Sequence, residues 1–261
     1  MSFTHILLTK SQGIATLTFN RPEKLNALNQ DMTLELRQAL DDVSQDPGVR
    51  VLILTGQGRA FMAGADVKTF LGVNPLTARR FVQRAHDFLF RLEALPIPVI
   101  AAVHGFALGA GFEIALACDF IYAAESAKLG LPEITLGIIP GAGGTQRLTR
   151  LVGRSLAKEI IMTGRMLEAG EARSASIVAQ VFPEDRLYEE TLKTAQTLAQ
   201  KGRLALEAAK KAVDRGADVD LRNGCALEVD LFALCFASSD PQEGVKAFLE
   251  KRPAVFQEEP A

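Results

Sequence analysis

Cysteine is scarce in this chain of 261 residues, which contains only Cys118, Cys225 and Cys235. The three cysteines do not have the spacing of metal ligands, and two of them lie among apolar residues. We therefore expect reduced thiols in a cytoplasmic protein, and no metal site.

An excess of basic charge is also missing. The chain has 29 Lys and Arg residues against 31 Asp and Glu residues, a formal net charge of −2, so no nucleic-acid partner is expected. The most apolar stretch, 105–124, approaches the length of about 20 residues that a membrane-spanning helix needs. It contains Glu113, Asp119 and three glycines without flanking basic residues, so we expect a buried helix and strand and no membrane partner. The first ten residues lack the pattern of a secretory signal.

The usual motifs for nucleotide binding and for serine hydrolysis are absent as well. There is no G-x-x-x-x-G-K-[ST] phosphate loop, and residues 105–111 have the glycine spacing G-x-x-x-G-x-G, which differs from the dinucleotide fingerprint. No G-x-S-x-G nucleophile elbow occurs. His104 is one of only three histidines, and its place at the end of a predicted strand favours a structural role over a catalytic one.

The residues that are present predict an α/β core followed by helices. Hydrophobic residues make up 48% of the chain, which suffices for the core of one large domain or two unequal ones. Alternation and apolar runs predict strands at 5–9, 13–19, 51–54, 98–103, 120–123 and 177–182. Apolar periodicity predicts helices at 31–44 with Asp31 as the cap, at 75–95, at 143–151 and at 155–162. Beyond Pro183 it predicts only helices, so we divide the chain into a core of residues 1–201 and a helical region of residues 202–261.

A strand followed by a glycine-rich turn and a helix occurs twice, at 51–68 and at 98–117. Each places the backbone N–H groups of small residues at the carboxyl end of a strand, where open α/β sheets bind ligands. If the N–H groups of Ala65 and Ala110 converge, they form an oxyanion hole. The alternative is that the glycines only allow strand and helix to pack closely.

Two carboxylates stand in apolar surroundings. Glu113 lies between Phe112 and Ile114, and Glu133 lies between Pro132 and Ile134. In a shared apolar pocket their pKa values would separate, so that one holds a proton and the other does not, which suits the addition of water to an activated double bond. The alternatives are a carboxylate that the helix dipole stabilises for Glu113, and an exposed loop residue for Glu133.

Three motifs, in this order, resemble the crotonase superfamily and most closely its enoyl-CoA hydratase/isomerase family. They are F-M-A-G-A-D-V-K at 61–68, H-G-F-A-L-G-A-G-F-E at 104–113, and L-P-E-I-T-L-G-I-I-P-G-A-G-G-T-Q-R-L at 131–148. The similarity extends over nearly the whole chain, from Phe19 to Arg252.

The resemblance implies a spiral of ββα units with a helical C-terminal region that builds trimers, often paired into hexamers. It implies a 2-enoyl-CoA hydratase that forms 3-hydroxyacyl-CoA, as in fatty-acid degradation, with no cofactor because coenzyme A is part of the substrate. The oxyanion hole falls on Ala65 and Ala110, and the two hydratase glutamates fall on Glu113 and Glu133. Family members that only shift double bonds commonly lack the first glutamate.

The sequence departs from the family pattern at two positions. Ala110 stands where many hydratases have glycine, which keeps the N–H donor. Leu131 replaces a polar residue of familiar short-chain hydratases, a change that bears on the substrate more than on the reaction.

The residues expected to contact the substrate and its coenzyme A lie around the three motifs. They are Arg21, Lys24, Ala27, Arg59, Ala63, Asp66, Val67, Lys68, Gly109, Pro132, Gly141 and Lys251. The cations would meet the phosphates of coenzyme A, with Lys251 reaching in from a helix end or from a neighbouring subunit. For each cation, a solvated surface charge explains the residue equally well.

Two rival functions stay open at this point. One is another crotonase activity on a CoA thioester, such as isomerisation. The other is a non-enzymatic binding module associated with RNA, against which the balanced net charge argues.

Overall fold

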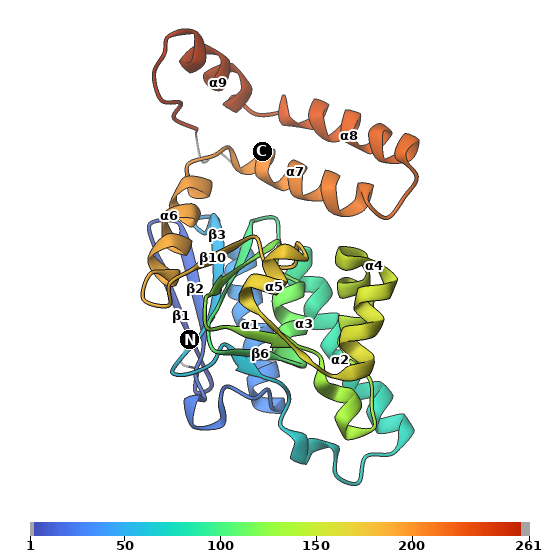
Figure 1. Cartoon of the computed structure of the whole chain (residues 1–261). Coiled ribbons are helices and arrows are strands. Elements are labelled where there is room, and N and C mark those ends of the chain that lie inside the picture. Colours follow the sequence, from blue (N-terminus) through green and yellow to red (C-terminus); the bar gives the residue numbers. More distant parts are fainter. Residues whose placement is uncertain (1–2, 257–261) are drawn as a thin grey trace.

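Two β-sheets organise the molecule (Figure 1). The structure is a computed structural model and describes residues 3–256. The large sheet has the strand order β1–β2–β3–β5–β7–β10 and the small sheet the order β4–β6–β8–β9. All neighbouring strands are parallel except β1 with β2 and β8 with β9. The strands are β1 (Ile6–Ser11), β2 (Ile14–Phe19), β3 (Val51–Gly56), β4 (Met62–Ala63), β5 (Val99–Val103), β6 (Phe106–Leu108), β7 (Phe120–Ala124), β8 (Lys128–Gly130), β9 (Met166–Glu168) and β10 (Gln180–Phe182).

A unit of two strands and a helix repeats along the core. The first strands of three units, β3, β5 and β7, are neighbours in the large sheet, and the strands that follow them, β4, β6 and β8, are neighbours in the small sheet. The three units end in the helices α2 (Pro75–Glu93), α3 (Ala110–Leu116) and α4 (Gly144–Thr163). Because each unit adds one strand to each sheet, successive units form the turns of a spiral, as the resemblance to the crotonase superfamily implies.

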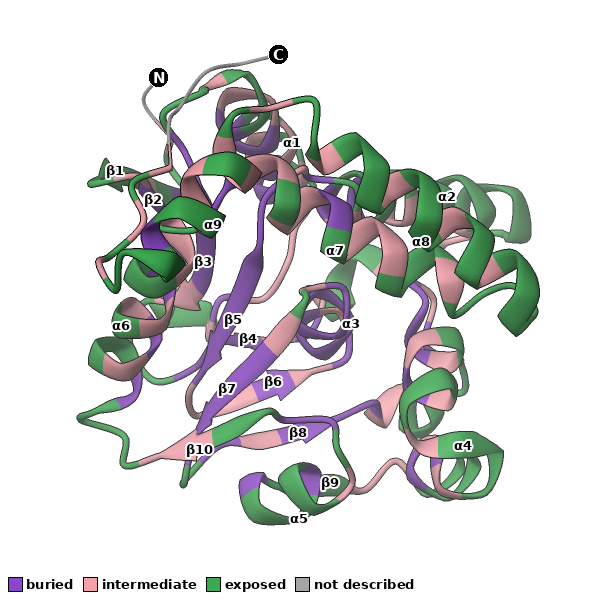
Figure 2. Ribbon diagram, turned by 90° about the horizontal axis from the view of Figure 1, so that it is seen from above, coloured by how far each residue is buried: buried purple, intermediate pink, exposed green. Residues whose placement is uncertain are grey.

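The central strands hold the core. All five residues of β5 are fully buried, and the first four of β3 are almost fully buried. Such continuous apolar runs are typical of parallel strands that are covered on both faces. Figure 2 shows these strands inside a rim of partly exposed helices, among them α1 (Gln30–Gln45), α5 (Ala169–Ser174) and α6 (Leu187–Ala199).

The structure corrects three details of the predicted elements. The cap of α1 is Asn29, whose side chain accepts a hydrogen bond from Met32 N at 2.8 Å, so Asp31 lies inside the first turn. The predicted helices at 143–151 and 155–162 are one helix, α4, with a kink at Gly153, where φ is 75° and ψ is 165°. The strand predicted at 177–182 is only β10, because Ile177 and Val178 pack into the core as part of a turn.

Three helices follow α6 and lie at one end of the molecule in Figure 1. They are α7 (Arg203–Gly216), α8 (Leu221–Cys235) and α9 (Asp240–Leu249). Within residues 3–256 no strand follows Pro183, as predicted. The predicted boundary at residues 201 and 202 falls in the connection between α6 and α7, and the division into two domains stays a prediction.

Three short 3-10 helices carry loop residues that the sequence singles out. They are η1 (Pro22–Lys24), η2 (Val67–Phe70) and η3 (Pro132–Leu136). Among the helices in the described chain, none has the length and apolarity to cross a membrane.

Candidate active site

The two predicted N–H donors, Ala65 and Ala110, follow neighbouring strands at equivalent positions. In the parallel pair of β4 and β6, Ala63 is opposite Leu108, so Ala65 and Ala110 each lie two residues beyond a paired position. A glycine precedes each alanine, and a Cβ placed on Gly109 would lie 3.6 Å from Cα of Gly64. The structure therefore brings the two turns together.

Both amides lack a hydrogen-bond partner among the described residues. Ala65 pairs with Leu28 in an isolated parallel β-bridge. The two hydrogen bonds of this bridge involve the residues on either side of Ala65, because Leu28 N donates to Gly64 O and Asp66 N donates to Leu28 O. The Ala65 N–H faces away from that bridge, and Ala110 precedes the first N–H bond of its helix, from Glu113 N to Gly109 O at 2.9 Å. Over residues 3–256 neither amide donates a hydrogen bond, so both can bind a ligand oxygen.

Glycines allow α3 to begin where it does. Gly109, before the helix, has φ of 50° and ψ of −124°, a conformation that side chains disfavour. Inside the first turn, a Cβ on Gly111 would lie 2.1 Å from Met62 O, so α3 packs directly on the backbone of β4. This close packing fixes the start of the helix against the other turn.

Glu113 points from the first turn of α3 into the protein and is only 2% exposed. Its Oε1 accepts hydrogen bonds from Ala142 N at 2.7 Å and from Gly144 N at 2.8 Å. Burial raises the pKa of Glu113, while these two N–H donors and the nearby charge of Arg147 act in the opposite direction.

Glu133 belongs to η3 and is partly buried, not an exposed loop residue. Its Oε1 lies 3.1 Å from where a Cβ of Gly109 would be, which places the carboxyl group beside the start of α3. Its Oε2 is buried without a hydrogen-bond partner in the described structure. Burial and the charge of Glu113 raise the pKa of Glu133 to about 7.

The two carboxyl groups therefore have different environments. Glu113 accepts two backbone N–H bonds, which stabilise its charged form, whereas within residues 3–256 Glu133 accepts an N–H bond only from its own backbone amide. Where two acids interact, the proton resides on the one with less hydrogen-bond support for its anion. Burial raises the pKa of both carboxyl groups, and Glu133 has the weaker hydrogen-bond support for its charged form.

Leu131 closes the site on the side of Glu113. It is fully buried, and a Cβ on Gly144 would lie 2.9 Å from both of its methyl groups and 3.1 Å from Cγ of Glu113. Gly144 thus lets the leucine and the glutamate pack against the start of α4. Leu131 provides an apolar wall that keeps the carboxyl group of Glu113 dry.

Most of the predicted binding residues lie on turns around the two amides. Asp66 caps η2, where its Oδ1 accepts a hydrogen bond from Lys68 N at 3.2 Å, and Val67 and Lys68 are exposed beside it. Ala63 ends β4, and Pro132 begins η3 next to Glu133. These residues therefore surround the predicted site without being drawn into the core.

The predicted cations near the N-terminus are joined by a residue that the sequence analysis missed. Asn26 is fully buried, and its Oδ1 accepts from Arg21 N at 2.8 Å. Its Nδ2 donates to Gln57 O at 3.0 Å and to Ala60 O at 2.7 Å. One side chain thus ties the turn that carries Arg21, Lys24 and Ala27 to the turn that carries Arg59. A buried asparagine with φ of 60° has no signal in the sequence that separates it from a surface turn residue.

Two further residues that the sequence analysis expects to contact the substrate, Gly141 and Lys251, lie far from each other in the structure. Gly141 lies close to α2, since a Cβ there would be 3.0 Å from Cγ2 of Val82. Lys251 is exposed after α9, which Figure 1 places at the end of the molecule opposite η2. This chain alone therefore does not bring Lys251 to its own Glu113 and Glu133, which leaves the neighbouring-subunit alternative.

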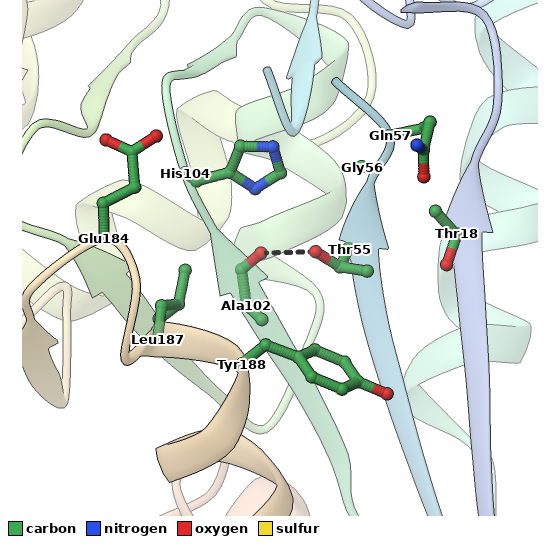
Figure 3. Close-up of a pocket in the computed structure, with 9 residues that line it drawn as sticks. All are labelled: Thr18, Thr55, Gly56, Gln57, Ala102, His104, Glu184, Leu187 and Tyr188. Atoms are coloured by element: carbon green, nitrogen blue, oxygen red, sulfur yellow. Dashed lines mark hydrogen bonds between the residues drawn. The ribbon is translucent and has the colours of Figure 1, made fainter. Parts of the chain in front are cut away.

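A separate pocket lies at the carboxyl ends of strands of the large sheet (Figure 3). It has a volume of about 340 Å³, and its lining includes Thr18, Thr55, His104, Glu184 and Tyr188, but neither Glu113 nor Glu133. Nε2 of His104 and Gly58 O lie 3.1 Å apart, and burial lowers the pKa of this histidine. The bond to a backbone carbonyl agrees with the structural role predicted for His104.

No cluster of three or more His, Cys, Asp or Glu side chains suited to a metal ion occurs within residues 3–256. The two turns and the two glutamates offer two acids that can exchange protons and two backbone amides that can polarise a carbonyl oxygen.

Comparison with known proteins identifies the family. The family model for enoyl-CoA hydratase/isomerase matches residues 9–259. The chain belongs to the enoyl-CoA hydratase/isomerase family.

Relatives and solved structures of this family resemble the chain over almost its full length. Crotonyl-CoA hydratase of Syntrophomonas wolfei is 44% identical over 257 residues, 98% of this chain and 99% of that protein. The 2,3-dehydroadipyl-CoA hydratase of Escherichia coli is 42% identical, covering 97% of this chain and 98% of that protein. The crystal structure of enoyl-CoA hydratase from Bacillus anthracis superposes with a TM-score of 0.94 at 41% identity, covering 98% of this chain and all of that one. This structural neighbour confirms the crotonase fold.

Proposed function

We propose that this protein is a 2-enoyl-CoA hydratase, which adds water across the α,β double bond of an enoyl-CoA thioester to form 3-hydroxyacyl-CoA. The observation that carries the proposal is the meeting of two backbone amides, without a hydrogen-bond partner in residues 3–256, with two largely buried carboxyl groups whose pKa values are raised. The hydratase names of the relatives support it.

In this mechanism the thioester oxygen binds to the N–H groups of Ala65 and Ala110. As a hydroxyl adds to Cβ, negative charge moves through the double bond to that oxygen, and the two amides stabilise it. The start of α3 adds the positive end of a helix dipole at the same place. Loss of one such donor typically raises a barrier by roughly 3–4 kcal/mol.

The two glutamates divide the proton transfers. Glu113, whose charged form the amides of Ala142 and Gly144 stabilise, accepts a proton from the attacking water. Glu133, whose pKa is raised to about 7, delivers its proton to Cα. Water thus supplies the hydroxyl group at Cβ, and the proton that Glu113 takes from it replaces the one that Glu133 gives to Cα, once it passes from Glu113 to Glu133 before the next turnover.

The substrate takes its place from the turns around the amides. The phosphates of coenzyme A meet the cations among Arg21, Lys24, Arg59 and Lys68, and the adenine lies beside Ala27 and Asp66. Ala63, Val67, Gly109, Pro132 and Gly141 line the path of the pantetheine and acyl groups. The substrate itself supplies coenzyme A, so the reaction requires no further cofactor.

The same proposal extends to assembly and cellular role. Phe232 of α8 and Phe248 of α9 are 68% and 82% exposed, which suits contacts between copies in a homotrimer or homohexamer. Lys251 follows α9 and would then reach the site of a neighbouring subunit. The reaction fits fatty-acid degradation by β-oxidation in the cytoplasm.

The experiment is a hydration assay with crotonyl-CoA and longer 2-enoyl-CoA esters, followed by loss of the absorbance of the conjugated thioester. The wild-type protein should hydrate at least one of these esters, and Glu113→Gln should abolish hydration almost completely. If Glu113→Gln instead keeps double-bond isomerisation at the wild-type rate while hydration is absent from both proteins, the chain is an isomerase. Binding without turnover of any ester would make it a binding module.

A further inference from the structure

The loop before α4 determines where the carboxylate of Glu113 points. Both hydrogen bonds to its Oε1 come from this loop, from the amides of Ala142 and Gly144. No other hydrogen bond to this carboxylate is present in residues 3–256. Any shift of the loop therefore turns the carboxylate away from its working position.

Arg147 holds this loop from the first turns of α4. Its Nη1 donates to Ala142 O at 2.9 Å, and its backbone N donates to Gly143 O at 2.8 Å. The peptide group between Ala142 and Gly143 lies between the two peptide groups that donate to Glu113. One arginine thus fixes the middle of the segment whose two ends bind the carboxylate.

Gly143 allows the guanidinium group to approach so closely. Its φ is 100°, and an added Cβ would lie 2.1 Å from Nη1 of Arg147. Any side chain at this position would displace the guanidinium group from the loop. Arg147 can therefore hold the loop only because residue 143 is a glycine.

Glu93, the last residue of α2, in turn holds Arg147. The two side chains form a bidentate pair, with Nε to Oε1 at 2.5 Å and Nη2 to Oε2 at 2.8 Å. The guanidinium carbon also lies 5.7 Å from the centre of the Phe90 ring. The side chain of Arg147 is only 12% exposed, so this pair is protected from water to a degree that surface pairs are not.

We infer that Arg147 is a positioning residue for the general base Glu113, with Glu93 as its anchor on α2. Arg147 acts through the backbone of residues 142–144 and does not touch a reacting atom. The inference rests on the proposed function, in which Glu113 accepts the proton from water.

Arg147 also has an electrostatic effect on the base. Its positive charge lowers the pKa of Glu113, against the effect of burial. Loss of that charge should therefore raise the pH at which Glu113 becomes ionised. A purely structural ion pair would change stability without moving this pH.

The test compares Arg147→Met and Arg147→Lys with wild type in steady-state hydration of crotonyl-CoA across pH. Arg147→Met should lower kcat by about 10- to 100-fold, as expected for a misplaced catalytic group, with KM within about threefold. The acidic limb of its pH profile should move to higher pH. Arg147→Lys keeps the positive charge but cannot form the bidentate pair with Glu93. Its kcat should therefore fall, while the acidic limb of its pH profile stays close to that of wild type.

Two further variants serve as controls. Arg150→Met removes an arginine from the same helix, one whose pair with Asp218 is exposed, and it should leave kcat and the pH profile unchanged. Glu93→Gln should lower kcat in the same direction as Arg147→Met, and the double variant should be no slower than Arg147→Met alone, because the two residues act as a unit.

The inference is overturned if folded Arg147→Met and Glu93→Gln have the kcat and acidic limb of Arg150→Met. It is also overturned if kcat falls in Arg147→Met, Arg147→Lys and Glu93→Gln without any shift of the acidic limb in Arg147→Met. If wild type itself does not hydrate any enoyl-CoA, the proposed function fails, which is a different result from a wild-type hydratase that tolerates loss of Arg147.

Discussion

Replacement of Glu133 by glutamine should stabilise the protein, and more at pH 8 than at pH 5. The carboxyl group of Glu133 is largely surrounded by protein, its Oε2 has no hydrogen-bond partner in the described residues, and its pKa is raised from 4.5 to about 7. Above pH 7 the folded protein must therefore carry a charge that it disfavours. Glutamine at this position is neutral at every pH and removes that requirement.

The size of the effect follows from linkage between proton binding and folding. In the unfolded chain Glu133 ionises near 4.5, so the folded state binds the proton more tightly. Its favourable contribution to stability is complete below pH 4.5 and is lost as the pH rises to about 7. The difference between a pKa of 4.5 and one of about 7 corresponds to at most about 3.4 kcal/mol, and partial exposure of the side chain reduces this to about 1–2 kcal/mol.

The assay is urea unfolding of wild type and Glu133→Gln at pH 5 and pH 8, at one fixed protein concentration because an oligomer depends on it. Glu159→Gln is a suitable control, because Arg165 lowers the pKa of Glu159 and its contribution is constant between these two pH values. If the difference between wild type and Glu133→Gln is the same at both pH values, Glu133 does not have a raised pKa, and the assignment of the proton to it is wrong.

Three further predictions follow from the site. The kcat/KM for hydration should fall as the pH rises through about 7, because the proposed acid Glu133 loses its proton there; a profile that is flat between pH 6 and 9 would contradict this. Gly109→Ala introduces a side chain at φ of 50° and 3.1 Å from Oε1 of Glu133, so urea unfolding should show a loss of about 1–3 kcal/mol and kinetics a lower kcat. Asn26→Ala leaves buried backbone groups unpaired and disconnects the turn of Arg21 from the turn of Arg59. We therefore expect the free energy of unfolding to fall by about 1–3 kcal/mol and the KM for CoA thioesters to rise. If both values are unchanged, Asn26 does not hold the two turns together.

The longer elements of the fold could be predicted from periodicity, and the shortest ones could not. Helix α2 begins at Pro75 as predicted, and β5 follows from its apolar run. The small sheet has strands of two or three residues, such as Met62–Ala63 and Lys128–Gly130, which are too short for alternation to show. These strands form because neighbouring units of the spiral place them side by side, which is tertiary information.

The candidate site shows the same division. The local surroundings of Glu113 and Glu133 indicate two unusual carboxylates, and the structure brings both to the start of α3. The pair of Arg147 with Glu93 spans 54 positions and joins two helix ends, so no spacing rule points to it. The cap at Asn29 was missed for a simpler reason, since Asp31 two residues later is an equally good cap by residue type.

The central claim is that the amides of Ala65 and Ala110 bind the thioester oxygen next to the two glutamates. The most direct measurement is a crystal structure of the assembled protein with acetoacetyl-CoA, a thioester with a keto group at Cβ and no α,β double bond to hydrate. The account predicts the thioester oxygen about 2.7–3.1 Å from both amide nitrogens, with the acyl carbons facing Glu113 and Glu133. A thioester oxygen that contacts neither amide, or an acyl group bound in the pocket beside His104, would contradict it.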